Sequence, residues 1–352
     1  MDNVNFNQIK LARESRGLTQ TQLARFAHIA QSNLSKMEVG KLPIPDDALL
    51  RIATTLKYPL TFFCKKSQRT PMGAFYFRKR MSLSKTSIKT IESKRDIIRS
   101  AIDDLLQAVE VKECTLPHIR VTDNLTPSDI ARRVRAYFKL PKGPIQDLVK
   151  VLEDAGIIVY EMDFNSDKFM GFSIYTDAGQ PIIFVNKNMP NDRKRFTLGH
   201  ELGHLVMHIM FDTDEDDRQI EIQADEFSSE FNMPFLDCYF DIQRLQLRDL
   251  DNLKSYWKMS KAAILRRAYT AKTIDENRYK YYMIELSRIG ERKVERGYVD
   301  LDKPTLLSQI LDMHTSILNY TKSELANMLG LNMDDYNEYF YGLSKNRLTI
   351  RL

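Results

Sequence analysis

The motif HELGH at residues 200–204 constrains this chain most, because it predicts both a helix and the chemistry on one face of that helix. His200 and His204 are four residues apart, so both imidazoles lie on the same side of a helix and can reach one metal ion. Glu201 lies about a third of a turn from His200, within reach of a water molecule at that ion. This HExxH spacing is typical of zinc peptidases, with Glu201 as the general base.

A catalytic zinc site needs a third protein ligand and an open position. Glu221 is the best candidate, because it starts a predicted helix and faces the same way as the apolar stripe Ala224, Phe227 and Phe231. Asp225 follows one turn later, where it can orient a ligand histidine through the second ring nitrogen.

His208 is the alternative third ligand, since it shares a helix face with His200 and His204. On an unbroken helix, however, His200 and His208 are about 12 Å apart, too far to share an ion at ligand distances of about 2 Å. Residues 205–207 offer no glycine at which the chain could turn. We therefore expect His208 either beside the metal site or packed in the core.

Residues 7–63 predict a compact run of short helices. Thr19 is a suitable N-cap for a helix that carries Leu23, and a second short helix runs from Gln31 to Glu38. Two short helices joined by a tight turn, inside a five-helix bundle, form a helix-turn-helix layout.

The segment that follows is strongly basic. From Lys65 to Arg95 there are ten Lys and Arg residues and one acid, a surplus of +9 against +5 for the whole chain. Pro71 and Gly73 make residues 64–90 the expected linker, whose charges either contact DNA phosphates or only keep it solvated. Residues 91–111 predict a helix that forms a short coiled coil or lies on the domain that carries HELGH.

The central region has an αβ pattern, with helices expected at 128–138 and 144–154 and strands at 157–162, 172–175 and 182–185. Beyond Pro234 the pattern is helical. Thr321–Leu331 (TKSELANMLGL) resembles half of a second helix-turn-helix, but we identify no matching recognition helix after it.

The expected fold is multidomain and mainly α, with a small α+β zincin-like core. The 352 residues suit two or three domains, and 43% hydrophobic content is enough for packed cores. We expect a helix-turn-helix domain, a basic linker with a connecting helix, a peptidase core and a helical C-terminal region, over 1–63, 64–125, 126–240 and 241–352 respectively.

The location of the chain can also be predicted. No apolar run is long enough to span a membrane, and the first residues do not resemble a signal peptide. Three widely spaced cysteines without a CxxC motif are typical of reduced thiols. We expect a cytoplasmic protein with no membrane partner.

Two motifs together resemble the ImmA/IrrE family of metallopeptidases: RFTLGHELGHLVMH, and ExxAxxFxxxxxMP from Glu221 to Pro234. The segment YWKMSKAAILRRA at 256–268 is similar to the helical region downstream in that family, so the resemblance covers about residues 126–300. It implies a zinc protease with a glutamate ligand that cleaves a repressor and so switches on silenced genes. Asp225 replaces the usual Asn, and Asn232 lies in a stretch that is usually apolar.

The segment LTQTQLARFAHIAQSNLSKMEVGK separately resembles the Xre/Cro repressor family, and so implies a lambda-repressor-like domain. The resemblance implies that Gln20 contacts phosphate and that the recognition helix faces the major groove with Gln31, Ser32, Asn33 and Lys36. Gln and Asn can read adenine edges, and Lys can read guanine or bind phosphate.

The leading hypothesis is a transcription regulator that is also a zinc (Zn2+) endopeptidase. It would sit on a double-stranded DNA operator as a homodimer and cleave a repressor or antitoxin partner, or its own linker. The alternative is a DNA-binding sensor or antitoxin whose peptidase fold binds metal, ligand or partner without proteolysis. A third hypothesis is a housekeeping peptidase that uses the N-terminal helices for protein contacts.

Overall fold

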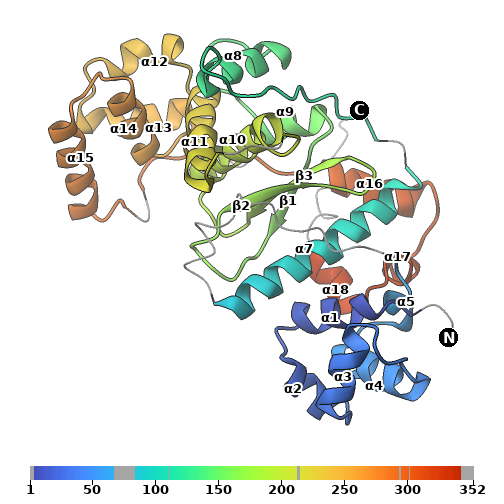
Figure 1. Ribbon diagram of the computed structural model, residues 1–352. Helices are drawn as coiled ribbons and strands as arrows, with labels where there is room; N and C mark the ends of the chain where they lie inside the picture. The colour runs from blue at the N-terminus through green and yellow to red at the C-terminus, as the bar shows by residue number, and fades with distance from the viewer. Residues whose placement is uncertain are drawn as a thin grey trace. The chain divides into compact units, whose positions relative to one another are not determined.

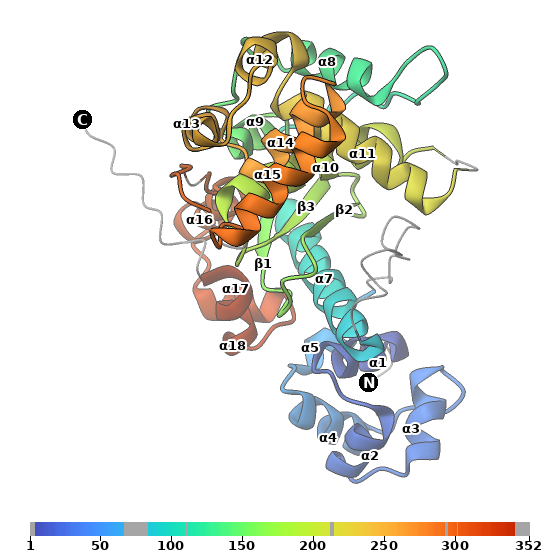
Figure 2. The same ribbon diagram turned by 90° about the vertical axis from the view of Figure 1, so that its left-hand side faces the viewer.

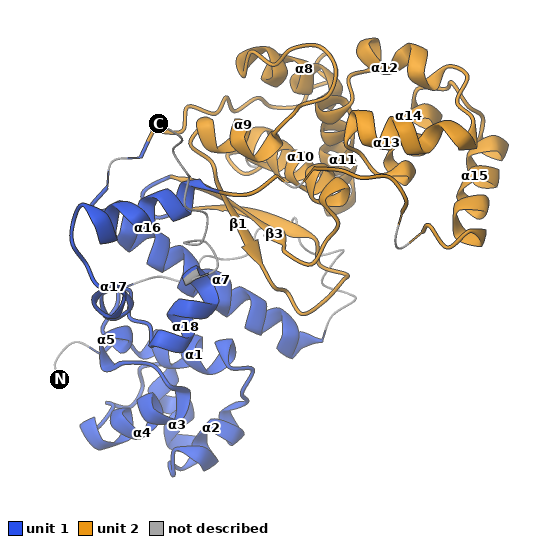
Figure 3. Cartoon of the chain, turned by 180° about the vertical axis from the view of Figure 1, so that it is seen from behind, with its two compact units in different colours: residues 1–111, 176–179, 305–352 blue, residues 112–175, 180–304 orange. Residues whose placement is uncertain are grey.

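The computed structural model describes residues 4–66, 84–109, 111–211, 215–292, 295–300 and 302–341 (Figure 1). The chain forms two compact units (Figure 3). Unit 1 consists of Met1–Val111, Thr176–Gly179 and Thr305–Leu352, and unit 2 of Lys112–Tyr175 and Gln180–Pro304. The sequence had suggested one C-terminal region over 241–352, whereas the structure divides that stretch at residue 304 and groups its last helices with the N-terminal ones.

Unit 1 begins with the expected five-helix bundle (Figure 2). Thr19 caps the second helix in a capping box with Gln22, in which each side chain bonds the backbone N–H of the other residue. Ile9, Leu23 and Leu34 from the first three helices are fully buried in the core of this bundle. The helices are α1 (Phe6–Ser15), α2 (Gln20–Phe26), α3 (Gln31–Glu38), α4 (Asp46–Leu56) and α5 (Leu60–Phe63).

The connecting helix α7 (Lys85–Leu106) begins earlier than the sequence suggested. Ser84 is its N-cap, since its hydroxyl accepts a hydrogen bond from the backbone N–H of Ser87. Residues 85–90, which we expected in the linker, are therefore helical, and residues 67–83 of that linker lie outside the described part of the chain. Helix α7 packs against α1 and against α16 (Leu306–Ser316).

The last described residues of unit 1 correct the sequence interpretation. After α17 (Lys322–Met328) the chain turns and continues as α18 (Met333–Tyr336), which runs directly into a π-helical turn, η3 (Asn337–Tyr341). The motif of Thr321–Leu331 is thus followed by a helical segment that the sequence analysis did not identify.

Unit 2 contains a three-stranded sheet of order β1-β3-β2. Strand β1 (Ile158–Met162) is parallel to β3 (Pro181–Asn186), and β2 (Gly171–Tyr175) is antiparallel to β3. The predicted hairpin is therefore present, and β3 is buried along its whole length because it is the central strand.

Helices α8 (Pro127–Tyr137), α9 (Leu148–Asp154), α10 (Asn191–Met207) and α11 (Asp217–Asn232) build the core of unit 2 with the sheet. Helix α10 packs on β2 and β3 and, on another side, against α11. A Cβ added at Gly203 would lie 3.1 Å from the Phe227 ring. The glycine therefore lets α10 and α11 approach closely at the HELGH turn.

A second helical core in unit 2 surrounds the fully buried Trp257. It is formed by α12 (Phe235–Ile242), the 3₁₀ turn η2 (Leu247–Asp249), α13 (Leu250–Trp257), α14 (Lys261–Thr270) and α15 (Glu276–Arg288). Among the described helices, none combines the length and the apolar character that crossing a membrane would require.

Candidate metal centre and nucleic-acid interface

The structure brings His200 and His204 of α10 together with Glu221 of α11. All three residues are buried, and their ligand atoms lie within 4.8 Å of one another. The two Nε2 atoms are 3.0 Å apart. Glu221 Oε2 lies 3.7 Å from His200 Nε2, and Oε1 lies 3.5 Å from His204 Nε2.

These distances fit a zinc ion without rearrangement. Ligand bonds of about 2.0 Å in tetrahedral geometry place neighbouring ligand atoms about 3.3 Å apart. The three measured separations, from 3.0 to 3.7 Å, lie on both sides of that value. Two imidazoles and one carboxylate also leave a fourth position open, as catalytic zinc sites do.

Asp225 orients His200. Its Oδ1 lies 2.8 Å from His200 Nδ1 and accepts a hydrogen bond from that nitrogen. This bond leaves Nε2 of His200, which points to Glu221, unprotonated and available to a metal. Asp225 thus lies one turn after Glu221 and against His200, one of the candidate ligands.

His208 supports His204 from the other side. The two Nδ1 atoms are 3.0 Å apart, and His208 Nε2 lies 2.9 Å from Gln223 Oε1. The Gln223 amide in turn donates to Glu215. If Nε2 of His204 faces the metal, its Nδ1–H donates to His208, whose Nε2–H donates to Gln223. The sequence analysis singled out His208 but not its two further partners. Gln223 lies on α11, and Glu215 lies just before that helix.

Burial keeps these imidazoles neutral. Desolvation lowers the pKa of His204 to about 3, and it also lowers the pKa of His208. A neutral imidazole has a lone pair for a metal ion, so His204 is in its ligand form at neutral pH.

Glu201 is buried on the side of α10 that meets the sheet. Its carboxylate accepts a hydrogen bond of 3.1 Å from the hydroxyl of Ser173, which lies on the edge strand β2. A Cβ added at Gly171 would lie 3.7 Å from Glu201 Cγ. The edge strand β2 thus lies against the expected general base.

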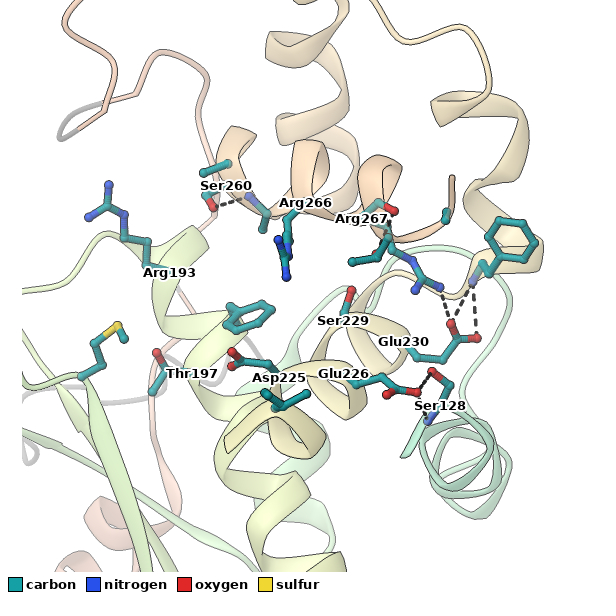
Figure 4. Close-up of a pocket in the computed structure, with 18 of the residues that line it drawn as sticks. Ser128, Arg193, Thr197, Asp225, Glu226, Ser229, Glu230, Ser260, Arg266 and Arg267 are labelled. Carbon is teal, nitrogen blue, oxygen red and sulfur yellow. Dashed lines mark hydrogen bonds and ion pairs between the residues drawn. The ribbon is translucent and has the colours of Figure 1, made fainter. Parts of the chain in front are cut away.

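A pocket of about 960 Å³ opens beside this cluster, lined by α10, α11 and α14 (Figure 4). Thr197 and Asp225, which accepts a hydrogen bond from His200, are among its lining residues, and so is Met170, just before β2. Arg193 and Arg266 bring positive charge to it. Asp225 thus connects the cluster to this pocket, whose lining carries arginines together with the carboxylates of Asp225, Glu226 and Glu230.

The residues expected to contact DNA lie together at the start of α2 and along α3. Gln31, Ser32, Asn33 and Lys36 are exposed, and Gln20 is partly exposed. On α3, Ser32 and Lys36 lie four residues apart on the side away from the buried Leu34, and Gln31 and Asn33 are exposed at the start of the helix. Their arrangement is that of a recognition helix with one face in the core and the other free.

A buried network positions that helix. The guanidinium of Arg13 donates two hydrogen bonds to Glu38, at 2.6 and 2.9 Å. Gln20 also donates to Glu38, and its oxygen accepts from the amide of Gln31 at 3.2 Å. Gln20 therefore links the two helices besides facing solvent, and Arg13 and Glu38 are positioning residues that the sequence pattern did not single out.

The fold and the cluster together define a helix-turn-helix DNA-binding domain joined to a metallopeptidase-like domain. Comparison with protein families supports both parts. Residues 9–63 match the helix-turn-helix family model, and residues 152–269 match that of the M78 peptidases, described as the IrrE N-terminal-like domain. The expected fusion is confirmed, and the peptidase match extends through α13 into α14. No curated protein and no solved structure matched the chain.

Proposed function

We propose that this protein is a DNA-binding regulator whose zinc-dependent endopeptidase cleaves a protein partner, such as a repressor or antitoxin. The observation that carries the proposal is the convergence of His200, His204 and Glu221, with Glu201 held beside an edge strand. A site that served structure alone would not need an open fourth position or a carboxylate next to it.

The residues divide the chemistry between them. Zinc bound by the two histidines and Glu221 would polarise the scissile carbonyl and lower the pKa of water. Glu201 takes the proton from the attacking water and then passes it to the leaving amine. Ser173 holds the carboxylate of Glu201 by a hydrogen bond to one of its oxygens. Asp225 and His208 keep the ligand imidazoles in the required tautomers.

The substrate would be an extended polypeptide. Strand β2 lies at the end of the strand order, and an edge strand can pair with an extended segment through main-chain hydrogen bonds. The pocket that starts at Met170 would receive side chains of that segment. Arg193 and Arg266 in its wall favour a carboxylate on the substrate.

The N-terminal domain would hold the protein at a DNA operator. Helix α3 would enter the major groove, with Gln31 and Asn33 at adenine edges, Ser32 beside them and Lys36 at guanine or phosphate. A homodimer would match a two-fold operator. Gln20 would contact phosphate from the start of α2.

Cleavage of a partner explains the structure better than cleavage of the chain itself. After a cut between residues 67 and 83, the N-terminal bundle would still be held by the packing of α1 on α7. Arg16 is also bound to Asp335 by two hydrogen bonds of 2.5 and 2.7 Å. Self-cleavage alone would therefore not release the DNA-binding domain.

The test is metal content and proteolysis of the full chain with two variants. We expect about one zinc per chain in the wild type and in Glu201→Gln, and none in Glu221→Ala. A co-expressed candidate repressor should be cleaved only by the wild type. Metal-free wild-type protein that still folds and binds DNA would overturn the peptidase and support the non-proteolytic sensor.

A further inference from the structure

Residues 321–341 repeat the sequence pattern of residues 19–39 at an offset of 302 residues. Thr19 and Thr321 each precede a helix, and Leu23-Ala24 corresponds to Leu325-Ala326. Helix α17 has the same length as α2, and each end of α17 lies 302 residues after the corresponding end of α2. The similarity therefore extends past the turn, where the sequence motif alone had ended.

The local geometry of the two segments is the same. Thr321 forms a capping box with Glu324 whose two backbone bonds measure 2.8 and 3.2 Å, as do those between Thr19 and Gln22. Both turns contain a residue with positive φ, His28 at 53° and Gly330 at 68°.

The hydrogen bonds that close the two turns also correspond. Ile29 N–H donates to Ala24 C=O at 2.9 Å, and Leu331 N–H donates to Ala326 C=O at 2.8 Å. The buried positions match as well, because Leu34 and Tyr336 face the core at equivalent places. The second segment is thus a helix-turn-helix in structure.

The positions of the second segment that correspond to the DNA-reading positions of α3 have different chemistry. The positions of Gln31, Ser32, Asn33 and Lys36 correspond to Met333, Asp334, Asp335 and Glu338. Three carboxylates replace two neutral polar side chains, Ser32 and Asn33, and the cation Lys36, and Met333 replaces Gln31. DNA phosphates would repel carboxylates at these positions, whereas a cation such as Lys36 would neutralise a phosphate.

Cations of unit 1 occupy this acidic face. Asp335 is almost fully buried and binds the guanidinium of Arg16 with both oxygens, at 2.5 and 2.7 Å. Glu338 binds Lys94 of α7 at 2.7 Å. Asn332 donates to the carbonyl of Lys57, at the end of α4. Figures 1 and 3 show α18 beside α1 and α5.

We infer that residues 321–341 are a second helix-turn-helix motif whose recognition face does not read DNA but docks within the same unit, on the N-terminal helix-turn-helix domain through Asp335 and on α7 through Glu338. In the second motif, Asp335 and Glu338 stand at the positions that Asn33 and Lys36 occupy in the first. These two carboxylates make the docking contacts. Of the two motifs only the first would then read DNA bases, through α3, and the second would hold the first one in place.

The docking is tested by amide hydrogen exchange of the full chain with Asp335→Asn. Asp334→Asn is the matched control, because it removes the same charge at the neighbouring exposed residue. We expect at least tenfold faster exchange at the C-terminal ends of α1 and α4 in Asp335→Asn, and no change in Asp334→Asn. Equal exchange in both variants would overturn the docking.

A milder variant covers the case in which Asp335→Asn does not fold. Arg16→Lys keeps the charge but loses the planar fork that binds both oxygens of Asp335. Exchange at the C-terminal ends of α1 and α4 should be faster than in the wild type, but by a smaller factor than in Asp335→Asn. Exchange at the wild-type rate at both helix ends would overturn the proposal.

The loss of DNA reading is tested at equivalent positions of the two motifs. With a random-sequence 30-base-pair duplex at low salt as the probe, Lys36→Ala should weaken binding several-fold, because a phosphate contact is lost. Glu338→Gln should leave the affinity for the duplex within twofold of the wild type or increase it. Weakening by Glu338→Gln as large as that by Lys36→Ala would show that the second motif also binds DNA, and would overturn the inference.

Discussion

Asp225→Ala should weaken zinc binding about tenfold while leaving the three candidate ligands in place. Asp225 acts on the metal through His200, whose Nδ1–H donates to its Oδ1 at 2.8 Å. Loss of such a partner of a ligand histidine costs 10- to 100-fold in affinity. The side chain of Asp225 is 62% exposed, so water screens its charge and the lower end of that range applies. Tenfold corresponds to about 1.4 kcal/mol.

Asp225→Asn separates orientation from charge. An amide oxygen can still accept the hydrogen bond from His200, so the Asn variant should stay within about threefold of the wild type. Glu226→Ala is the matched control, because Glu226 is the next residue on α11 but accepts its hydrogen bonds from Ser128. The assay is competition for zinc with a chromophoric chelator.

Two results would refute this reasoning. If Asp225→Ala bound zinc as tightly as the wild type, the hydrogen bond to His200 would have no part in orienting the ligand. If Asp225→Asn were as weak as Asp225→Ala, the charge of Asp225 would matter and its orienting hydrogen bond would not.

Three further predictions follow from the packing and burial of named residues. Gly199→Ala should destabilise the protein by about 1–3 kcal/mol, because the added Cβ would lie 2.4 Å from the amide nitrogen of Asn232. In a thermal melt the melting temperature should fall further than for Gly203→Ala, where the atom nearest to the added Cβ is 3.1 Å away. Glu38→Ala should cost about 3 kcal/mol in denaturant unfolding, the lower end for breaking a buried ion pair, because the buried Arg13 loses two hydrogen bonds to Glu38 but keeps Glu14 and the carbonyl of Leu18; a wild-type midpoint would contradict this. Metal-free protein should lose stability as the pH falls from about 6.5 towards 3, by about 1.4 kcal/mol per pH unit. In that window the unfolded chain protonates His204 whereas the folded chain, in which burial lowers the pKa of His204 to about 3, does not; a flat profile in urea titrations would contradict it.

Asn232 shows how structure explains a departure from the family pattern. Asn232 lies in a stretch that the resemblance led us to expect as apolar, yet it is buried and its amide donates to the carbonyl and hydroxyl oxygens of Ser228. The amide lies next to Gly199, which has no side chain. The polar residue is therefore accommodated because all of these groups meet at one contact between α10 and α11.

Much of the candidate site could be predicted from the sequence because its parts follow from local geometry. Helical periodicity alone puts His200 and His204 on one face, and it puts Asp225 one turn after Glu221. Capping residues such as Thr19 act over three positions, so they locate helix starts. The β2–β3 hairpin follows from alternation and a glycine turn, which are also local.

Tertiary structure decided the contacts between residues far apart in the chain. No local pattern indicates that Arg16 will meet Asp335, 319 residues later, or that Gln223 will meet His208 from another helix. Such contacts depend on which apolar faces pack together, and packing also decides which charges are buried. For this reason the sequence predicted both functional motifs, whereas only the structure showed that the last helices dock on the first ones.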